Sequence, residues 1–266
     1  MRTMIRLLPA ILLAITPTAV VAGVFYNNSS QFEGHERERM EGAWLVRVKA
    51  GQKAFFYATG YPENCPRLTV SCKRRGYVLG GDLMVASYTT GPFTVVDFIG
   101  PKGIPVDGAI ETRQLEPVPT PLPTLPSWLR LWQSGSEQQI RISRSVGAGV
   151  LYFEGEATWG ASDPERVKRG GVHIGSFAAF VKPSNQWGGF IDQAGGAGDP
   201  GAKMPRKVSQ NGLQLDWARA FPYQNEDGYN CQVRFRLLGP YLLAYDDHNQ
   251  CGGVNVTFTG VYRQTR

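Results

Sequence analysis

The chain has few residues of the kinds that build catalytic and metal centres. Its 266 residues include three histidines, His35, His173 and His248, and none has the spacing of a two-histidine helical site or a cysteine–histidine metal site. There is no G-x-S-x-G nucleophile elbow, no H-E-x-x-H motif and no phosphate-binding lysine loop. We therefore expect no catalytic residue, no metal site and no cofactor, and a protein that is not an enzyme.

Long apolar runs and dense charge are also scarce. Beyond the N-terminus no segment is apolar enough to cross a bilayer, so we expect no transmembrane span in the mature chain. The net charge of +6 comes from 28 basic and 22 acidic residues that are mixed along the chain. A nucleic-acid-binding protein needs a denser basic stripe or a reading motif. Nucleic acid is therefore not an expected partner.

The N-terminus carries the pattern of an export signal. Arg2 and Arg6 precede an apolar run of about ten residues, and small residues follow up to Ala22 and Gly23. The run is much shorter than the roughly 20 residues of a membrane span. We expect residues 1–22 to be a signal peptide and the protein to be exported, either periplasmic or secreted.

Four cysteines lie in the part that remains after cleavage. An even number of cysteines in an exported protein predicts disulfides. We favour the pairs Cys65–Cys72 and Cys231–Cys251 among the three possible connectivities, because each pair then stays on one side of a proline-rich segment. An antiparallel meander near the C-terminus also brings Cys231 close to Cys251.

That proline-rich segment, PVPTPLPTLP, divides the chain. Its five prolines remove backbone donors and fix φ, which predicts an extended, solvated linker over residues 117–127. The segment 23–43 is polar without periodicity and predicts a flexible arm. Between them, residues 44–116 form one expected β domain, and residues 128–266 form a larger antiparallel β domain, either a barrel or a sandwich. The expected fold class is all-β.

The first domain has short strands at regular spacing. We expect strands at 77–79, 83–88, 93–99 and 104–110, separated by turn signals such as Thr-Gly-Pro and Gly-Pro-Lys-Gly. The stretches Y-V-L-G-G-D-L-M-V, G-P-F-T-V-V-D-F and G-I-P-V-D-G-A-I resemble a bacterial Src-homology-three-like domain. Many relatives place tryptophan after the last glycine, where this chain has Ala109. The resemblance implies a small β barrel and a binding role.

The second domain shows clear alternation near its end. Val233, Phe235 and Leu237 share one face of an expected strand, and Gln232, Arg234 and Arg236 share the other. Val254, Val256, Phe258 and Tyr262 alternate with polar residues in the last expected strand. A three-strand antiparallel meander follows. The terminal block resembles the ending of uncharacterised exported bacterial proteins that also carry the Src-homology-three-like segment.

Several motifs have plainer explanations than a site. The string GAGDPG at 196–201 lacks the strand and helix of a nucleotide site. The cluster Asp246, Asp247, His248 and Asn249 is better explained by turn and capping hydrogen bonds than by a cation. Glu154 and Glu156 share a strand face as a solvent-facing pair does. Trp128, Trp132 and Trp159 are expected to fill the second domain.

Four aromatic side chains of the first domain are candidates for a ligand groove: Tyr77, Tyr88, Phe93 and Phe98. At least half of them are expected to fill the small barrel instead. We expect a non-catalytic binding protein of the cell envelope, with peptidoglycan, another glycan or a peptide as partner. The alternative is an inhibitor of a lysozyme-like cell-wall hydrolase. A hydrolase that uses Glu154 or Asp246 is the third and weakest hypothesis.

Overall fold

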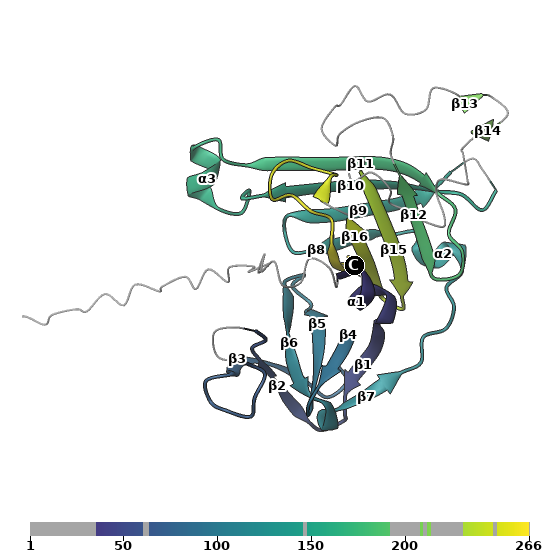
Figure 1. The fold of residues 1–266 in the computed structure, drawn as a ribbon. Coiled ribbons are helices and arrows are strands. Elements are labelled where there is room, and N and C mark those ends of the chain that lie inside the picture. The colour runs from purple at the N-terminus through teal and green to yellow at the C-terminus, as the bar shows by residue number, and fades with distance from the viewer. Residues whose placement is uncertain are drawn as a thin grey trace, which may run out of the picture.

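The computed structural model is built mainly from two large antiparallel β sheets (Figure 1). It describes residues 36–60, 64–145, 148–191, 208–209, 212–213, 231–246 and 249–265. The expected signal peptide (1–22), residues 23–35 of the expected arm, the GAGDPG string, Asp247 and His248 lie outside these ranges. The all-β fold class is confirmed.

The first sheet has seven strands in the order β3-β2-β6-β5-β4-β1-β7. Its elements are β1 (Trp44–Val48), β2 (Lys53–Tyr57), β3 (Lys73–Leu79), β4 (Leu83–Thr90), β5 (Phe93–Ile99), β6 (Pro105–Glu111), the 3-10 helix η1 (Thr112–Gln114) and β7 (Leu115–Val118). β5 has the predicted bounds. One face of the sheet encloses a core that includes Val48, Phe56, Met84 and Val96.

The second sheet has eight strands in the order β11-β10-β9-β8-β17-β16-β15-β12. Its elements are α2 (Leu125–Trp128), β8 (Leu131–Ser134), β9 (Gln138–Arg144), β10 (Leu151–Trp159), α3 (Pro164–Lys168), β11 (His173–Val181), β12 (Trp187–Ile191), β15 (Gln232–Leu238), β16 (Tyr241–Asp246) and β17 (Gly260–Gln264). A separate two-stranded ribbon consists of β13 (Val208–Ser209) and β14 (Gly212–Leu213).

The second sheet curls until its two ends approach each other. β11 and β12 are joined by a tight turn in which Ser184 and Trp187 exchange backbone hydrogen bonds of 2.8 and 2.9 Å, and the two strands lie against each other. β17, the last strand of the chain, pairs with β8, the first strand of this sheet. The expected barrel-or-sandwich domain is therefore a nearly closed up-and-down barrel.

Aromatic side chains fill this barrel. Trp128 and Trp132 are both 1% exposed, and the ring centroid of Phe177 lies 4.7 Å from that of Phe258 and 5.9 Å from that of Phe235. Trp132 Nε1 donates to the carbonyl of Trp128 at 3.1 Å, so its one polar atom is satisfied. The predicted core role of these two tryptophans is confirmed, while Trp159 is only half-buried.

Both predicted disulfides are present. Cys65 pairs with Cys72, and Cys231 pairs with Cys251, each on its own side of the proline-rich segment. The C-terminal meander β15-β16-β17 is confirmed as well. Its last strand is shorter than predicted: it begins at Gly260, and Val254 is 69% exposed in the preceding loop. Asn255, with a φ of 65°, turns the chain there and prevents extended pairing.

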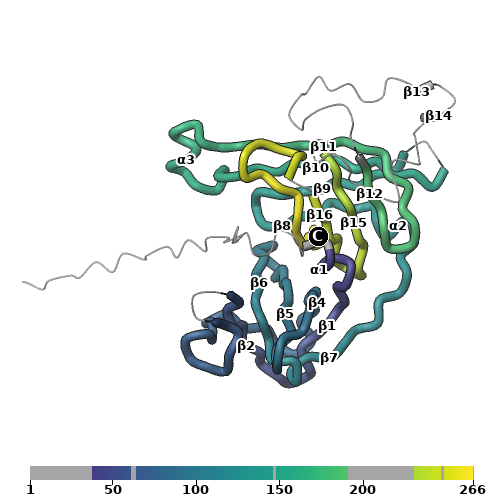
Figure 2. The backbone as a smooth tube through the Cα atoms, in the orientation of Figure 1, coloured from purple at the N-terminus to yellow at the C-terminus, as the bar shows by residue number. Residues whose placement is uncertain are grey.

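The linker prediction is correct in the middle and wrong at both ends. Pro117 and Val118 belong to β7 and pair with β1, and the helix α2 begins at Leu125. Between them the chain is mostly exposed, with Leu122 67% exposed. Figure 2 shows this connection running along one side of the molecule from β7 to α2.

The C-terminal part of the expected flexible arm is a helix. α1 (Glu36–Gly42) lies between the two sheets, with Met40 6% and Ala43 3% exposed (Figure 1). These two side chains pack with Leu45, Val85 and Ile99 of the first sheet and with residues of β15 and β16 in one buried cluster. Met40 is the one large apolar residue among the mixed charges of α1, and it packs against both sheets.

The polar face of β15 is buried as well as its apolar face. Gln232, Arg234 and Arg236, which share the polar face, are 1%, 8% and 9% exposed. Arg236 donates to the carbonyls of Met40 and Glu41 at 2.8 and 2.9 Å, and Arg234 forms a 2.5 Å ion pair with Glu41. The helix α1 therefore covers the polar face of this strand.

Candidate functional site

The four predicted aromatic side chains lie in different environments. Phe93 is 1% exposed, and its ring packs 4.9 Å from that of Tyr57 beneath the Cys65–Cys72 disulfide. Phe98 is half-buried against Phe56, with ring centroids 6.5 Å apart. These two side chains serve the core, as expected of at least half of the set.

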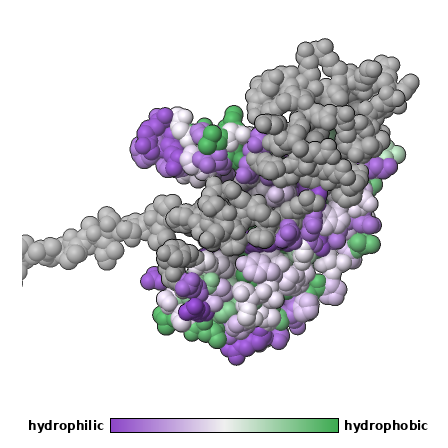
Figure 3. Space-filling model, viewed as in Figure 1, coloured by the Kyte–Doolittle hydropathy of each residue, from purple (hydrophilic) through white to green (hydrophobic). Residues whose placement is uncertain are grey.

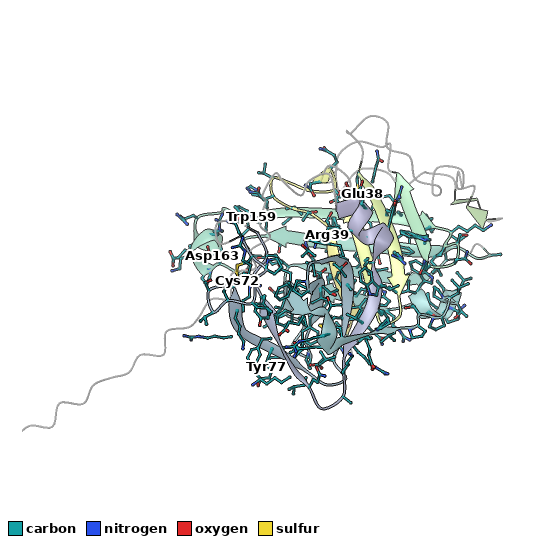
Figure 4. The ribbon with its side chains drawn as sticks, turned by 60° about the horizontal axis from the view of Figure 1, so that its bottom comes forward. Glu38, Arg39, Cys72, Tyr77, Trp159 and Asp163 are labelled. Carbon is teal, nitrogen blue, oxygen red and sulfur yellow. A yellow bond between two sulfur atoms is a disulfide. The ribbon has the colours of Figure 1, made fainter. Side chains whose placement is uncertain are left out.

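Tyr88 and Tyr77 are more accessible but lie apart from each other. The guanidinium of Arg39 lies 5.4 Å from the centroid of the half-buried Tyr88 ring, which α1 therefore covers in part. Tyr77 is 49% exposed on β3, the edge strand. Figure 4 shows Tyr77 at the far end of the first sheet from Glu38 and Arg39. The four aromatics do not line one groove, and only Tyr77 presents its ring openly.

Tyr77 belongs to a surface that we name the lysine–aromatic face, formed by Lys53, Phe55, Lys73 and Tyr77. The rings of Phe55 and Tyr77 lie directly opposite each other on β2 and β3, with centroids 5.9 Å apart. The ammonium of Lys53 lies 3.7 Å from the Tyr77 ring centroid and 5.1 Å from that of Phe55. The ammonium of Lys73 lies 4.0 Å from the Phe55 centroid. Each distance is within the range of a cation–π contact.

Alternation along the hairpin creates this face. Ala54, Phe56 and Val78 point into the core of the first sheet and are 0%, 2% and 1% exposed. Residues one position away must then point outward, which places Phe55 and Tyr77 on the other side. The loop that joins β2 to β3 is constrained by the Cys65–Cys72 disulfide and by a 2.7 Å hydrogen bond from Ala58 N to the carbonyl of Cys72.

The lysine–aromatic face contains two lysines and no acidic residue. Within the described ranges, neither Lys53 nor Lys73 forms an ion pair with a carboxylate. Arg75 and Leu79 on the same strand are also exposed. Arg47 on β1 and Arg113 in η1 do pair with Glu116 and Glu111. The charge on the hairpin is therefore available to an external anion.

Sequence reasoning found Tyr77 but missed Phe55, Lys53 and Lys73. The signal was present, because Lys53 and Phe55 are two residues apart in KAFFY, as strand-face neighbours are. Their pairing with Lys73 and Tyr77 depends on the register between β2 and β3, which includes a bulge between Phe55 and Tyr57. The sequence does not specify that register.

A second polar cluster lies where α1 meets the first sheet. Asp97 on β5 is the cross-strand neighbour of Asp107 on β6. Burial raises the pKa of Asp97 to about 6; the charge of Arg39 acts to lower it and that of Asp107 to raise it. Arg39 also donates to Ser87 Oγ at 3.5 Å. Because α1 holds Arg39 over this cluster, we assign it to the junction between the sheets and not to a ligand site.

A projecting arm is the third feature. The segment between β10 and β11, residues 160–172, contains α3 and extends past the barrel (Figures 1 and 4). Asp163 caps α3 by accepting from the backbone N–H of Glu165 and Arg166 at 2.9 and 3.3 Å. The guanidinium of Arg166 lies 4.0 Å from the Trp159 ring centroid. In Figure 3 the tip of the arm is hydrophilic, with hydrophobic atoms behind it.

The carboxylates considered for hydrolysis have structural surroundings. Asp246 is 2% exposed and its Oδ2 accepts from Phe258 N at 3.1 Å, which supports the loop before β17. Glu154 and Glu156 are exposed on β10, as predicted of a solvent face, and Glu156 accepts from Gln139 at 2.5 Å. Nothing in this surface resembles a pair of carboxylates in a cleft.

The described residues offer little else that could hold a ligand. No group of three or more histidine, cysteine, aspartate or glutamate side chains is arranged to bind a metal ion in this part of the chain. A hollow of about 320 Å³ lies between α2 and the start of β10, and Arg144 is the one charged residue among those that line it. The lysine–aromatic face is therefore the best-defined candidate site.

Comparison with known proteins adds no relative to this picture. No protein-family model, no curated protein and no solved structure matches the chain. None of the helices in the described ranges is long and apolar enough to span a membrane.

Proposed function

We propose that this protein is an exported, non-catalytic binding protein of the cell envelope, with peptidoglycan, another glycan or a peptide as its ligand. The observation that carries the proposal is the lysine–aromatic face, in which Lys53 and Lys73 lie over the rings of Tyr77 and Phe55 on an exposed, braced hairpin. Aromatic and cationic groups held on a rigid element are typical of a recognition surface.

Two further observations support the proposal. Both disulfides are formed, which favours an oxidising compartment and therefore export. The strand order β7-β1-β4-β5-β6, with η1 between β6 and β7 and the long β2-β3 hairpin between β1 and β4, supports the resemblance to a Src-homology-three-like barrel. Such barrels bind ligands without performing chemistry, in keeping with the binding role that we propose.

Sedimentation with purified peptidoglycan tests this function. The purified protein is incubated with insoluble peptidoglycan and the bound fraction is measured after centrifugation, with bovine serum albumin as a non-binding control. We expect retention that saturates with increasing protein concentration. If the protein stays in the supernatant at every concentration, peptidoglycan is not its ligand and the leading form of the proposal is wrong.

The projecting arm favours the second candidate, an inhibitor of a lysozyme-like hydrolase. Asp163 and Arg166 brace the arm, and Val167 at its tip is 53% exposed, so the segment has the form of an element that enters a partner's cleft. We expect an inhibitor to slow lysozyme at stoichiometric excess and a Val167→Glu variant to slow it less. Unchanged lysozyme activity at about 100 μM of this protein, roughly a hundred times the dissociation constant of a micromolar inhibitor, removes this candidate.

A further inference from the structure

We propose that the lysine–aromatic face binds an anionic glycan, a polysaccharide that carries carboxylate groups along its length, on its sugars or on the substituents attached to them. This inference rests on the proposed function and names both the surface and the chemistry of its ligand.

The charge of the face indicates an anionic ligand. The ammonium groups of Lys53 and Lys73 lie on the aromatic pair, one 3.7 Å from the Tyr77 centroid and the other 4.0 Å from the Phe55 centroid. Within the part of the chain that the structure describes, no carboxylate forms an ion pair with either lysine. The two ammonium groups beside the ring pair can each attract a carboxylate of a polymer that carries carboxylates at intervals.

The open shape of the face is suited to a polymer of sugar rings. Phe55 and Tyr77 stand side by side on neighbouring strands of a sheet surface, with centroids 5.9 Å apart and interplanar angle 60°. Neither ring lines the hollow between α2 and β10, and a small molecule on an open sheet surface would have little of its own surface covered. A glycan strand lies along an open surface and contacts it through successive sugar rings.

The face also differs from a typical protein-docking surface. A stable protein interface has an apolar centre from which charged residues are depleted. Here the charged lysine side chains lie over the rings at the centre of the surface. We therefore favour a glycan over an acidic peptide, which the same charges would also attract.

The support beneath the face is rigid. Ala54, Phe56 and Val78 are buried in the core directly behind it, and the Cys65–Cys72 disulfide constrains the loop that joins β2 to β3. Binding would therefore require little ordering of the backbone, which reduces its entropic cost.

Two insoluble polysaccharides with a common amino-sugar backbone distinguish charge from sugar recognition. Peptidoglycan carries carboxylates on the peptides attached to its sugars, while chitin, a polymer of N-acetylglucosamine, has none. We expect the purified full chain to bind peptidoglycan about tenfold more tightly than chitin at low salt, and to lose most of that preference at about 0.5 M NaCl, where surface charges are screened. Equal binding to the two polymers, independent of salt, would overturn the inference.

Variants locate the site. We expect the double variant Lys53→Gln and Lys73→Gln to bind peptidoglycan about five- to twentyfold more weakly, and Tyr77→Ser about fivefold more weakly. Lys53→Arg with Lys73→Arg keeps the charge and should retain binding. Lys102→Gln is the matched control, because Lys102 is an exposed lysine on the β5–β6 turn, outside the lysine–aromatic face. That turn contacts the second domain, where Gly103 accepts a hydrogen bond from Gly135.

The outcomes separate this inference from the proposed function. If the wild-type protein binds peptidoglycan and the lysine-to-glutamine pair binds equally well, the function stands and the assignment of the face is wrong. If the wild-type protein does not bind peptidoglycan at all, the function in its leading form fails. If soluble polyglutamate competes as well as soluble acidic polysaccharide, the ligand is an acidic peptide and the glycan assignment is overturned. Urea unfolding of each variant confirms that the comparison is between folded proteins.

Discussion

At the scale of single residues, Asp97 connects stability to pH. Burial raises its pKa from 3.8 to about 6, so ionising the carboxylate costs more in the folded state than in the unfolded state. This cost is absent below about pH 4, increases through the window between the two pKa values and is complete above about pH 6. Asp97 itself therefore makes the protein less stable as pH rises across that window.

We expect an Asp97→Asn variant to lose this pH dependence. Because Asp97 keeps part of its surface exposed, its contribution is at most about 2–3 kcal/mol between pH 4 and pH 6. Urea unfolding measured at several pH values would show a flatter profile for Asp97→Asn than for the wild type. Parallel profiles would mean that the Asp97 carboxyl has an ordinary pKa.

Arg236 makes a stabilising contribution that can be measured directly. It donates to the carbonyls of Met40 and Glu41 at the C-terminal end of α1, and its guanidinium lies 5.1 Å from the Trp187 ring centroid. Truncation leaves these carbonyls without their donor in a buried position, so Arg236→Ala should lower the free energy of unfolding by about 2–4 kcal/mol. Arg141→Ala, at an exposed position on β9, should change it by less than about 0.5 kcal/mol. Equal effects would contradict the assigned role.

At the scale of secondary-structure elements, prediction succeeded where local patterns decide the outcome. The strand Phe93–Ile99 follows from its β-branched and aromatic residues and from the turn signals on both sides. The disulfide between Cys231 and Cys251 follows from the meander that joins them. Each of these features depends on residues close together in the chain.

Prediction failed where distant elements meet. Alternation places Arg236 on the polar face of a strand, but it does not predict the hydrogen bond with Glu41, a residue of α1 that lies 195 positions away. Met40 is one apolar residue in a charged segment, too weak a signal to predict α1. The candidate site shows the same limit, because Phe55 and Tyr77 become neighbours through a hairpin register that the sequence leaves open.

At the scale of the whole molecule, the two sheets share a buried junction. Leu45, Val85 and Ile99 of the first sheet pack with Leu238, Tyr241 and Leu243 of the second. Arg263 donates to the carbonyl of Ile99 at 2.5 Å, and the Tyr241 hydroxyl donates to the carbonyl of Leu83. The proline-rich linker is therefore not the only connection between the two halves.

Cleavage of the linker tests this junction. A protease site introduced beside the exposed Leu122 allows the chain to be cut after folding. We expect the two fragments to co-elute in size-exclusion chromatography at micromolar concentration, because the apolar junction and its buried hydrogen bonds remain. Separate elution of two folded fragments would show that the linker alone holds the halves together.

The position of α1 also affects the order in which the protein is assembled. α1 and β1 are among the first elements of the described chain, while β15 and β16, which cover them, are among the last. During synthesis or translocation from the N-terminus, Leu45 and Val85 have no partner from the second sheet until residues 232–246 have emerged. The first sheet must therefore expose an apolar surface for most of this time, which makes the nascent chain dependent on protection from aggregation until its C-terminal strands arrive.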